Sequence, residues 1–586
     1  MPSPRFCYTR GVSTWETRGA IQLLRALTQF YYRRKYGAMA QSLGWPDVAP
    51  DGRRGFIVIQ VDGLAHDHLL EALRAGEMPH LRRMLDDGRL ALTAWPCGLP
   101  SSTPAVQAAI MFGSREDVPG FRWYEKESGL AFVAKRPDQV QALQARIKGD
   151  RVGILIGGSS YGNMFDGDAE LALFTLAALP PRRFFESVRG MGAFLLFLLS
   201  PFRILRVIGL TILGYLRALT WRGGVHGHRA FWSALLLNPL AVAAVNALFT
   251  EAQTFGVVMD IYRRVPAIYV NYNTYDEAAH RFGATHRAAF STLRDIDRRI
   301  GQIEGMRRRT QGREYDLFVL SDHGNTPSLP FSRQARQSLG EFIASHLGHG
   351  ISLDEVFSQP SRAATKARYL LDEVSELEPR VPPRVRRMLQ ALRHSMDRRV
   401  PADPETATYD LQRREDVVVR VSGPLAHVYF NVAPRRLELI EVALLYPQLL
   451  DRLAATERVG LVVGRAGERT VVLGPGGGSA VIAAGRVEVE LPNPLAPYGD
   501  FDSVARQLHE LAGFPHSGDL ILLGAMRVDG RVVAFEEQVA THGGLGGPQG
   551  TPFIAWPAAV ELEPVEGPQD LYRFFRARYA GGQAGG

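Results

Sequence analysis

The chain has 586 residues, of which 46% are apolar and 22% are charged, and its formal net charge is +8. This length indicates about two to four structural units, and this composition excludes a mainly disordered chain. The only cysteines are Cys7 and Cys97, which excludes a disulfide framework and favours a reducing compartment. No dense Lys/Arg stripe with interleaved aromatic residues occurs, so we expect no nucleic-acid partner.

The first fifty residues contain several arginines but no apolar run near the start. A cleaved secretory signal is therefore not expected, and residues 20–32 are typical of a short amphipathic helix. We predict that the protein is cytoplasmic, or associated with a membrane on its cytoplasmic side.

Short apolar runs rich in β-branched residues predict buried strands, and they occur at 56–61, 267–271, 316–320 and 519–523. Helical patterns lie between them, for example at 68–87 and 285–304. Alternating strands and helices predict an α/β fold, in which a mostly parallel sheet is sandwiched by helices. Ligands of such sheets collect at the carboxyl ends of the strands.

A first interruption of this pattern, residues 185–253, predicts a hydrophobic helical hairpin. Its two apolar runs, 192–219 and 231–249, approach the roughly 20 residues that a membrane-spanning helix needs. Arg203 and Arg206 interrupt the first run, which favours a hairpin lying in the plane of a membrane surface over a spanning one. A helical lid packed on the catalytic domain is the other interpretation.

A second interruption, residues 332–497, predicts a small α+β cap. Its first part is helical and rich in arginine, and its second part alternates like strands at 416–421, 427–432, 460–464, 470–473 and 487–491. The run Gly474–Gly478 lacks the Gly-Lys-Ser/Thr of a P-loop, so we predict a turn. The predicted division is an N-terminal helical extension, three core segments separated by the hairpin and the cap, and a disordered tail: 1–53, 54–184, 185–253, 254–331, 332–497, 498–575 and 576–586.

Five separated motifs supply carboxylate, imidazole or hydroxyl groups just after strands or at turns. They are Asp62 in Val-Asp-Gly, Thr103 in Ser-Ser-Thr-Pro, Asp276 and His280 in Asp-x-x-x-His-x-x-Gly, Asp322 and His323 in Ser-Asp-His-Gly, and His542 in Thr-His-Gly. In this order the set resembles the alkaline-phosphatase superfamily, and within it the type I phosphodiesterase/nucleotide pyrophosphatase branch. The resemblance spans about residues 54–560, apart from the two interruptions.

The resemblance implies two divalent metal ions and a threonine nucleophile. One ion would be held by Asp276, His280 and His542, and the other by Asp62, Asp322, His323 and the Thr103 oxygen. A mixed carboxylate and imidazole set suits Zn2+, with Mn2+ as a substitute, and such an ion pair can bind both the attacking and the leaving oxygen of an in-line displacement.

The sequence around Thr103 predicts a helix start that favours phosphate. Thr103 is the expected N-cap, Pro104 the first helical residue, and 105–112 the rest of the helix. Free N–H groups at a helix N-terminus favour a phosphate group and its developing charge. Our hypothesis is attack by Thr103, followed by hydrolysis of a covalent phosphothreonine. Ser101 and Ser102 are rival nucleophiles.

One position departs from the branch that the motifs resemble. Nucleotide pyrophosphatases carry an Asn three residues after the threonine, where this chain has Val106. Gln107 is the candidate substrate-binding residue in its place. A sulfatase is excluded, because Cys97–Ser101 does not fit the Cys-x-Pro-x-Arg motif of that branch. We expect surface positions for His66 and His68, and a turn at Asn163.

The predicted function is a metal-dependent phosphoric-ester hydrolase, more specifically a phosphodiesterase or nucleotide pyrophosphatase-like enzyme. A phosphatase, a phosphotransferase or mutase of the same superfamily, and a membrane-docked scaffold with a vestigial site are the alternatives. The expected partners are a phosphate-ester substrate, either lipid-linked or a nucleotide, and a membrane surface contacted by residues 185–253.

Overall fold

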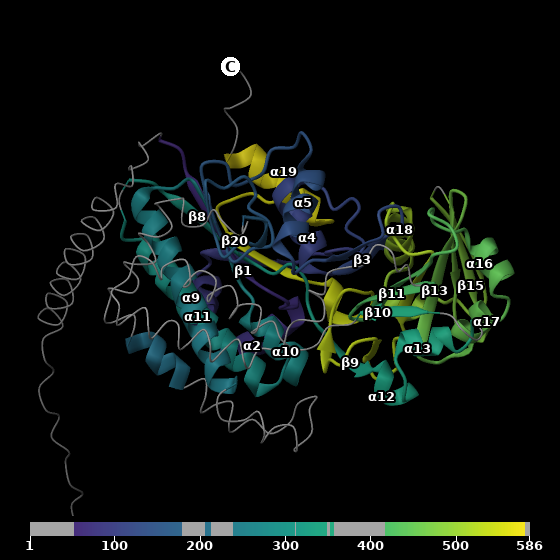
Figure 1. The fold of residues 1–586 in the computed structure, drawn as a ribbon. Helices are drawn as coiled ribbons and strands as arrows, with labels where there is room; N and C mark the ends of the chain where they lie inside the picture. The colour runs from purple at the N-terminus through teal and green to yellow at the C-terminus, as the bar shows by residue number, and fades with distance from the viewer. Residues whose placement is uncertain are drawn as a thin grey trace, which may run out of the picture.

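The computed structural model describes residues 52–178, 205–212, 238–310, 312–347, 352–356, 416–483 and 485–579. These residues form two large sheets with helices on both faces, and the sheets lie side by side (Figure 1). Nearly all of the predicted extension 1–53, much of the hairpin 185–253 and the arginine-rich part of the cap lie outside the described residues.

The first sheet has seven strands in the order β2-β20-β8-β1-β7-β5-β6. From β8 to β6 the neighbouring strands are parallel, and β20 and β2 run antiparallel at one edge. This arrangement confirms the predicted α/β fold with a mostly parallel sheet. The strands are β1 Gly55–Val61, β2 Leu90–Ala94, β5 Ser159–Tyr161, β6 Leu171–Leu173, β7 Ala267–Tyr272, β8 Tyr315–Leu320 and β20 Phe553–Pro557.

Successive side chains of β1 point to opposite faces of the sheet and pack into two separate cores. Ile57 and Ile59 pack into the core under one helical layer, and Phe56 and Val58 pack into the core under the other, as the two-residue period of a strand requires. The first layer contains α2 His66–Arg74, α3 Pro79–Asp86, α9 Asn238–Arg263, α10 Thr274–Phe282 and α11 Arg287–Arg307. The second layer contains α4 Thr103–Phe112, α5 Pro137–Lys148 and α19 Pro568–Tyr579.

The second sheet has eight strands in the order β10-β11-β12-β17-β13-β14-β15-β16, antiparallel except between β10 and β11. Its strands are β10 Leu353–Val356, β11 Val417–Ser422, β12 Leu425–Phe430, β13 Val459–Ala466, β14 Arg469–Leu473, β15 Ser479–Ala483, β16 Arg486–Glu490 and β17 Leu520–Gly524. One face packs on α12 Phe331–Ala335, α13 Leu339–Ala344, α16 Leu439–Leu445 and α17 Leu449–Ala455, and the other packs on α18 Phe501–Gly513.

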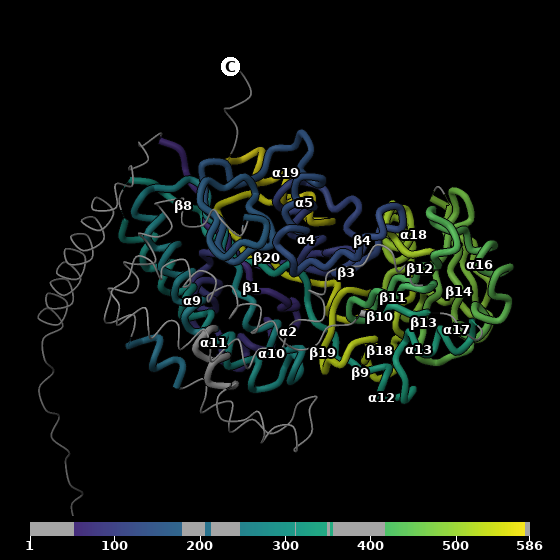
Figure 2. Tube along the Cα trace, in the orientation of Figure 1, coloured from purple at the N-terminus to yellow at the C-terminus, as the bar shows by residue number. Residues whose placement is uncertain are grey.

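The cap region forms strands close to the five predicted positions. Gly474–Gly478 is a turn, as predicted, built on a 3-10 turn at Pro475–Gly477. The run 519–523 was expected to be a core strand, and this prediction is wrong: β17 pairs with β12 and β13 in the second sheet. A strand buried on both faces has the same apolar pattern in either sheet. Figure 2 shows the chain returning from the second sheet (green) to the first through its last, yellow segments.

Three helix predictions need correction. The predicted helix 68–87 is two helices, α2 and α3, because Gly76 adopts a left-handed φ of 73° between them and Pro79 starts the second. The predicted hairpin limit at residue 253 lies inside α9, which continues to Arg263 along the first sheet. The predicted tail begins too early, because α19 reaches Tyr579. The helix expected at 285–304 needs no such correction, since it forms as α11 Arg287–Arg307.

No helix within the described parts of the chain combines the length and apolar character needed to cross a membrane.

Small β elements join the two large sheets. The hairpin of β3 Arg122–Glu125 and β4 Leu130–Val133 lies against β11. A three-stranded sheet contains β9 Thr326–Pro330, β18 Val532–Ala534 and β19 Ala540–Thr541. Two buried ion pairs strengthen this junction: Arg122 with Glu536 at 2.9 Å, and Lys126 with Asp519 at 3.0 Å.

We predict that Glu536→Ala lowers the free energy of unfolding by about 3 kcal/mol, because it removes a carboxylate that pairs with the buried Arg122 guanidinium. Urea denaturation followed by circular dichroism measures the change. The neighbouring Glu537 pairs with Arg333 at the surface, so Glu537→Ala is the matched control and should cost less than about 1 kcal/mol. Equal losses in both variants would contradict this account of the junction.

Candidate active site

Three neighbouring strands deliver most of the predicted ligands to one edge of the first sheet. Asp62 directly follows β1, Asp322 and His323 follow β8, and Asp276 lies on α10 just after β7. β8, β1 and β7 are adjacent and parallel, so their carboxyl ends meet at the same edge. The structure brings these residues together because of that topology.

His542 reaches the same edge through the three-stranded sheet. β19 pairs with β9 so that Thr541 lies opposite Thr326. His323 lies three residues before Thr326, and His542 follows Thr541 directly. The rings of His323 and His542 are stacked with their centroids 3.7 Å apart.

Thr103 lies in the first turn of α4. Ser102 is the residue before the helix, with an extended backbone, and Pro104 follows in the first turn. The prediction that Thr103 itself is the N-cap is therefore wrong by one residue. The helix start and its end at Gly113 are otherwise as predicted, so the free peptide N–H groups of the first turn of α4 lie close to Thr103.

The first predicted ligand group is Asp276, His280 and His542, and one donor atom from each lies within 4.8 Å of the others. His280 Nε2 lies 3.3 Å from Asp276 Oδ2 across one turn of α10, as the i, i+4 spacing predicts. His542 Nε2 lies 3.7 Å from Asp276 Oδ1. Asp276 is fully buried, and His280 is partly exposed.

The second group surrounds Thr103. Its hydroxyl oxygen lies 3.2 Å from His323 Nε2 and 3.5 Å from Asp62 Oδ1. His323 Nε2 lies 3.6 Å from Asp62 and 3.5 Å from Asp322 Oδ2. Asp62, Asp276 and His323 also form a compact trio of donor atoms, so Asp276 takes part in both groups.

Each of the three histidines is fixed by a backbone carbonyl. His280 Nδ1 contacts Ala540 O at 2.9 Å, His323 Nδ1 contacts Gly324 O at 3.0 Å, and His542 Nδ1 contacts Ser101 O at 3.0 Å. A carbonyl only accepts, so each Nδ1 donates its proton, which leaves Nε2 as the ring nitrogen that can bind a metal ion. All three Nε2 atoms point toward carboxylates of the site. A histidine that binds a metal through Nε2 carries its proton on Nδ1 and donates it to such an acceptor.

Two asparagines, which the sequence analysis missed, hold the carboxylates in place. Asn271 Nδ2 donates to Asp62 Oδ2 at 3.0 Å, and Asn325 Nδ2 donates to Asp276 Oδ1 at 3.0 Å. Both asparagines are buried. Their positions carried a usable signal: Asn271 ends a predicted strand, and Asn325 follows Ser-Asp-His-Gly.

The donor set fits divalent metal ions. Asp322 Oδ2 is a fully buried carboxylate oxygen without a hydrogen-bond partner, although a buried charge is costly unless it is paired. Carboxylate oxygens lie within 3.7 Å of imidazole Nε2 atoms. A divalent cation bound among these oxygen and nitrogen donors would offset the buried carboxylate charges. The oxygen and nitrogen donors suit Zn2+ and also Mn2+.

The close approach of Asp276 and Asn325 to the backbone of residue 63 requires a glycine at that position. A Cβ there would lie 2.5 Å from Asp276 Oδ1 and 2.6 Å from Asn325 Nδ2, and its φ is 73°. No other residue type meets both conditions.

Gln107 does not fit the predicted role in substrate binding. Its side chain is fully buried, and its amide donates to Gln60 Oε1 and Asn163 Oδ1 and accepts from the N–H of Met164. Gln107 cannot replace an Asn at position 106, because one step along a helix rotates the side chain by about 100°.

The buried network around Gln107 lies behind the site. Tyr269 donates to Gln60 Oε1 at 2.8 Å. Burial, and then the charges of Asp322 and Asp62, raise the pKa of Tyr269 well above its ordinary value. Tyr269 therefore remains a neutral donor, and the network acts as a neutral support.

The rival and neighbouring residues have other surroundings. Ser101 donates to Gly544 O and accepts from the N–H of Gly543, so its hydroxyl fixes the backbone that follows His542. Ser102 is buried, and His68 is buried rather than at the surface as expected. Asn163 is held by hydrogen bonds to Ser160 and Tyr269, in keeping with a structural role.

Fold and site together describe an α/β protein with a candidate metal centre at the carboxyl edge of a mostly parallel sheet. Residues 217–424 match the family model described as Type I phosphodiesterase / nucleotide pyrophosphatase, which confirms the resemblance seen in the motifs. The match includes Asp276, His280, Asp322 and His323, whereas Asp62, Thr103 and His542 lie outside it. No curated protein sequence gives a match.

Solved structures give distant similarities. Phosphonoacetate hydrolase from Sinorhizobium meliloti 1021, in complex with phosphonoformate, is 15% identical with a TM-score of 0.41, covering 91% of this chain and 96% of that one. Murine ectonucleotide pyrophosphatase / phosphodiesterase 5, an inactive variant in complex with AMP, is 10% identical with a TM-score of 0.42, covering 90% and 95%. At these scores the assignment of the site depends on the residues of this chain and on the family match.

We predict that Asn325→Ala weakens metal binding by about 10- to 100-fold, because Asp276 loses the donor that orients it. Competition with a chromophoric chelator measures the affinity for Zn2+. Asn493→Ala is the control. Asn493 lies in the predicted cap region, and its side-chain oxygen accepts a hydrogen bond from the N–H of Leu495. Unchanged affinity in a folded Asn325→Ala protein would contradict the ligand role of Asp276.

Proposed function

We propose that the protein hydrolyses phosphate diesters, or related phosphoanhydrides of nucleotides, with Thr103 as the nucleophile. The observation that carries this proposal is the position of Thr103 Oγ1, 3.2 Å from His323 Nε2 and 3.5 Å from Asp62 Oδ1 at the start of α4. A hydroxyl held among metal-ligand groups at a helix N-terminus suits nucleophilic attack on a phosphate.

Two divalent cations complete the proposed site. Asp276, His280 and His542 would hold one, and Asp62, Asp322, His323 and the Thr103 oxygen would hold the other, with Zn2+ as the expected metal and Mn2+ as a substitute. When bound, such ions lower the pKa of a coordinated hydroxyl and offset charge on the phosphoryl oxygens.

The reaction proceeds in two displacements. Thr103 Oγ attacks phosphorus, the bond to the leaving oxygen breaks, and the Thr103 proton is lost to solvent while the leaving oxygen takes up a proton, so the leaving group departs as an alcohol or a phosphate. Water then attacks the threonine-linked phosphate, which still carries its other ester group, restores the Thr103 hydroxyl and releases a phosphate monoester. The free N–H groups of the first turn of α4 favour the negative charge of the phosphoryl group in both steps.

The exposure of the site indicates the side from which substrate approaches. Asp276, Asp322 and His323 are fully buried, whereas Thr103, His280 and His542 retain some exposed surface. The nucleophile and the two outer imidazoles therefore form the accessible side. A lipid-linked substrate, contact of 185–253 with a membrane surface and a cytoplasmic location remain predictions from the sequence.

We expect Thr103→Ala to lower the turnover of bis-p-nitrophenyl phosphate by at least about a thousandfold while metal content stays near that of the parent. Elemental analysis supplies the second measurement. Thr103→Ser retains a hydroxyl and should retain measurable turnover, and Ser102→Ala is the control for the rival nucleophile. Undiminished turnover in Thr103→Ala would refute the assignment.

We also expect a higher kcat/KM for bis-p-nitrophenyl phosphate than for p-nitrophenyl phosphate, because the family match is to phosphodiesterases. Chelation should abolish both activities, and added Zn2+ or Mn2+ should restore them. A preference for the monoester would favour the phosphatase alternative, and transfer of the phosphoryl group to added glycerol would favour the phosphotransferase alternative.

A further inference from the structure

A cavity lies at the edge of the first sheet opposite the candidate active site. It has a volume of about 340 Å3 and lies where β1 and β8 begin, beside Arg54 and Asp316. The site residues Asp62 and Asp322 follow the other ends of these two strands. Six strand residues at about 3.3 Å each place the two regions roughly 20 Å apart.

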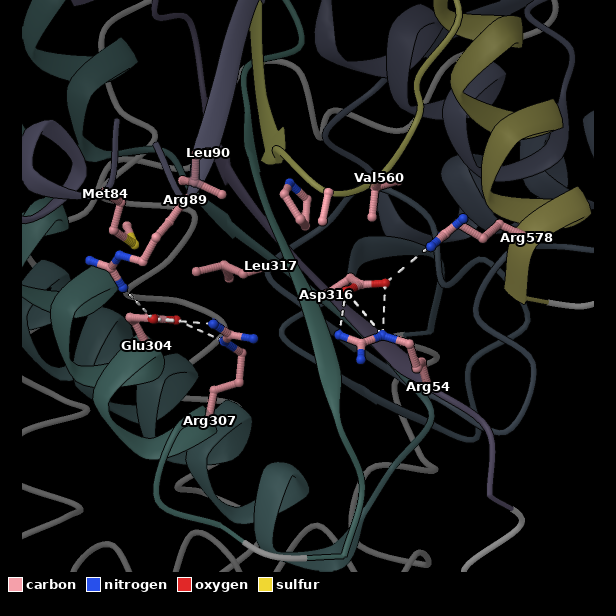
Figure 3. Close-up of a pocket in the computed structure, with 12 residues that line it drawn as sticks. Arg54, Met84, Arg89, Leu90, Glu304, Arg307, Asp316, Leu317, Val560 and Arg578 are labelled. Atoms are coloured by element: carbon pink, nitrogen blue, oxygen red, sulfur yellow. Dashed lines mark hydrogen bonds and ion pairs between the residues drawn. The ribbon is translucent and has the colours of Figure 1, made fainter. Parts of the chain in front are cut away.

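Four arginines from four separate segments line this cavity, together with two carboxylates. Arg54 precedes β1, Arg89 precedes β2, Arg307 ends α11 and Arg578 lies near the end of α19. The lining residues therefore carry four positive and two negative charges. Figure 3 shows them as two clusters with Leu317 between them: Arg89 and Arg307 beside Glu304, and Arg54 and Arg578 beside Asp316.

Carboxylates hold these guanidinium groups in place. Besides Glu304 and Asp316, which line the cavity, Asp87 pairs with Arg89 at 3.4 Å and Glu314 pairs with Arg54, both from outside the lining. Glu304 accepts from Arg89 at 2.9 Å and from Arg307 at 2.7 Å. Asp316 accepts from Arg54 at 2.7 Å and from the Tyr579 hydroxyl at 2.7 Å.

Arg578 makes a longer ion pair than the other three. Its Nε lies 3.9 Å from Asp316, 39% of its side chain is exposed, and its guanidinium lies 5.7 Å from the centre of the Tyr579 ring.

The remaining wall is apolar. Met84, Leu90, Leu317 and Val560 line it and are buried. A cavity with convergent cationic groups and an apolar wall, at the lower end of the range of about 300–1,000 Å3, is typical of a small-molecule site. Oriented guanidinium groups bind phosphate oxygens through paired N–H donors.

We propose that this cavity binds a small phosphate-bearing anion, with the phosphate between the two arginine clusters and any organic part against the apolar wall. Free phosphate and a nucleoside monophosphate share this chemistry, and the volume exceeds what phosphate alone fills. The site is separate from Thr103 and does not depend on the proposed function.

Titration calorimetry on the full chain tests the proposal with inorganic phosphate, AMP and adenosine as probes. We expect AMP, and more weakly phosphate, to bind, whereas neutral adenosine does not. Arg89→Gln/Arg578→Gln should weaken this binding by about tenfold or more, as expected for lost charge-assisted hydrogen bonds. Hydrolysis of bis-p-nitrophenyl phosphate should stay unchanged, because neither arginine belongs to the candidate active site.

Arg82→Gln is the matched control, since Arg82 lies on nearby α3, pairs with Asp86 and does not line the cavity. Arg578→Gln alone keeps the test available if the double variant fails to fold. Failure of the parent protein to bind either phosphate probe below about 1 mM would overturn the proposal. Equal affinities in the cavity variant and the control, or lower thermal stability of the variant without any loss of binding, would also overturn it and leave the arginines as structural ion pairs only.

Discussion

The chemistry of the site depends on three hydrogen bonds from imidazole Nδ1 atoms to backbone carbonyls. They come from His280, His323 and His542, and their acceptors are Ala540, Gly324 and Ser101. The bonds place a proton on each Nδ1 and fix the plane of each ring, so every Nε2 faces the carboxylates of the site. Since two of the acceptors belong to other segments than their histidines, these bonds also hold the segments of the site together.

The remaining architecture supports this arrangement. The parallel strands β8, β1 and β7 bring the carboxylates to one edge, and the small sheet of β9, β18 and β19 carries His542 to the same place. Buried ion pairs join the β3–β4 region to Glu536, which follows β18 of the small sheet, and to Asp519, which precedes β17 of the second sheet. Packing therefore supplies the positions, and the hydrogen bonds set the orientation of each ligand.

Much of the fold and of the candidate site follows from local pattern. An apolar run that ends in a carboxylate places that carboxylate at a strand end whichever strands become its neighbours, so Asp62 and Asp322 were predictable. Which sheet a run joins depends on partners far away in sequence, and for this reason 519–523 was misplaced. Gln107 and the asparagines show the same limit, since the partner of an amide group is set by tertiary packing. The break between α2 and α3 was in principle visible at Gly76 and Pro79.

The helix α9 has a mechanical consequence. It is one continuous element from Asn238 to Arg263, and midway along it the Gln253 amide donates to the backbone oxygen of Asn271, whose side chain holds Asp62. At 1.5 Å per residue, the start of α9 lies roughly 20 Å along the axis from that contact. A contact made at the first turns of α9 would therefore lie at a set distance from the candidate site, fixed by the length of one continuous helix.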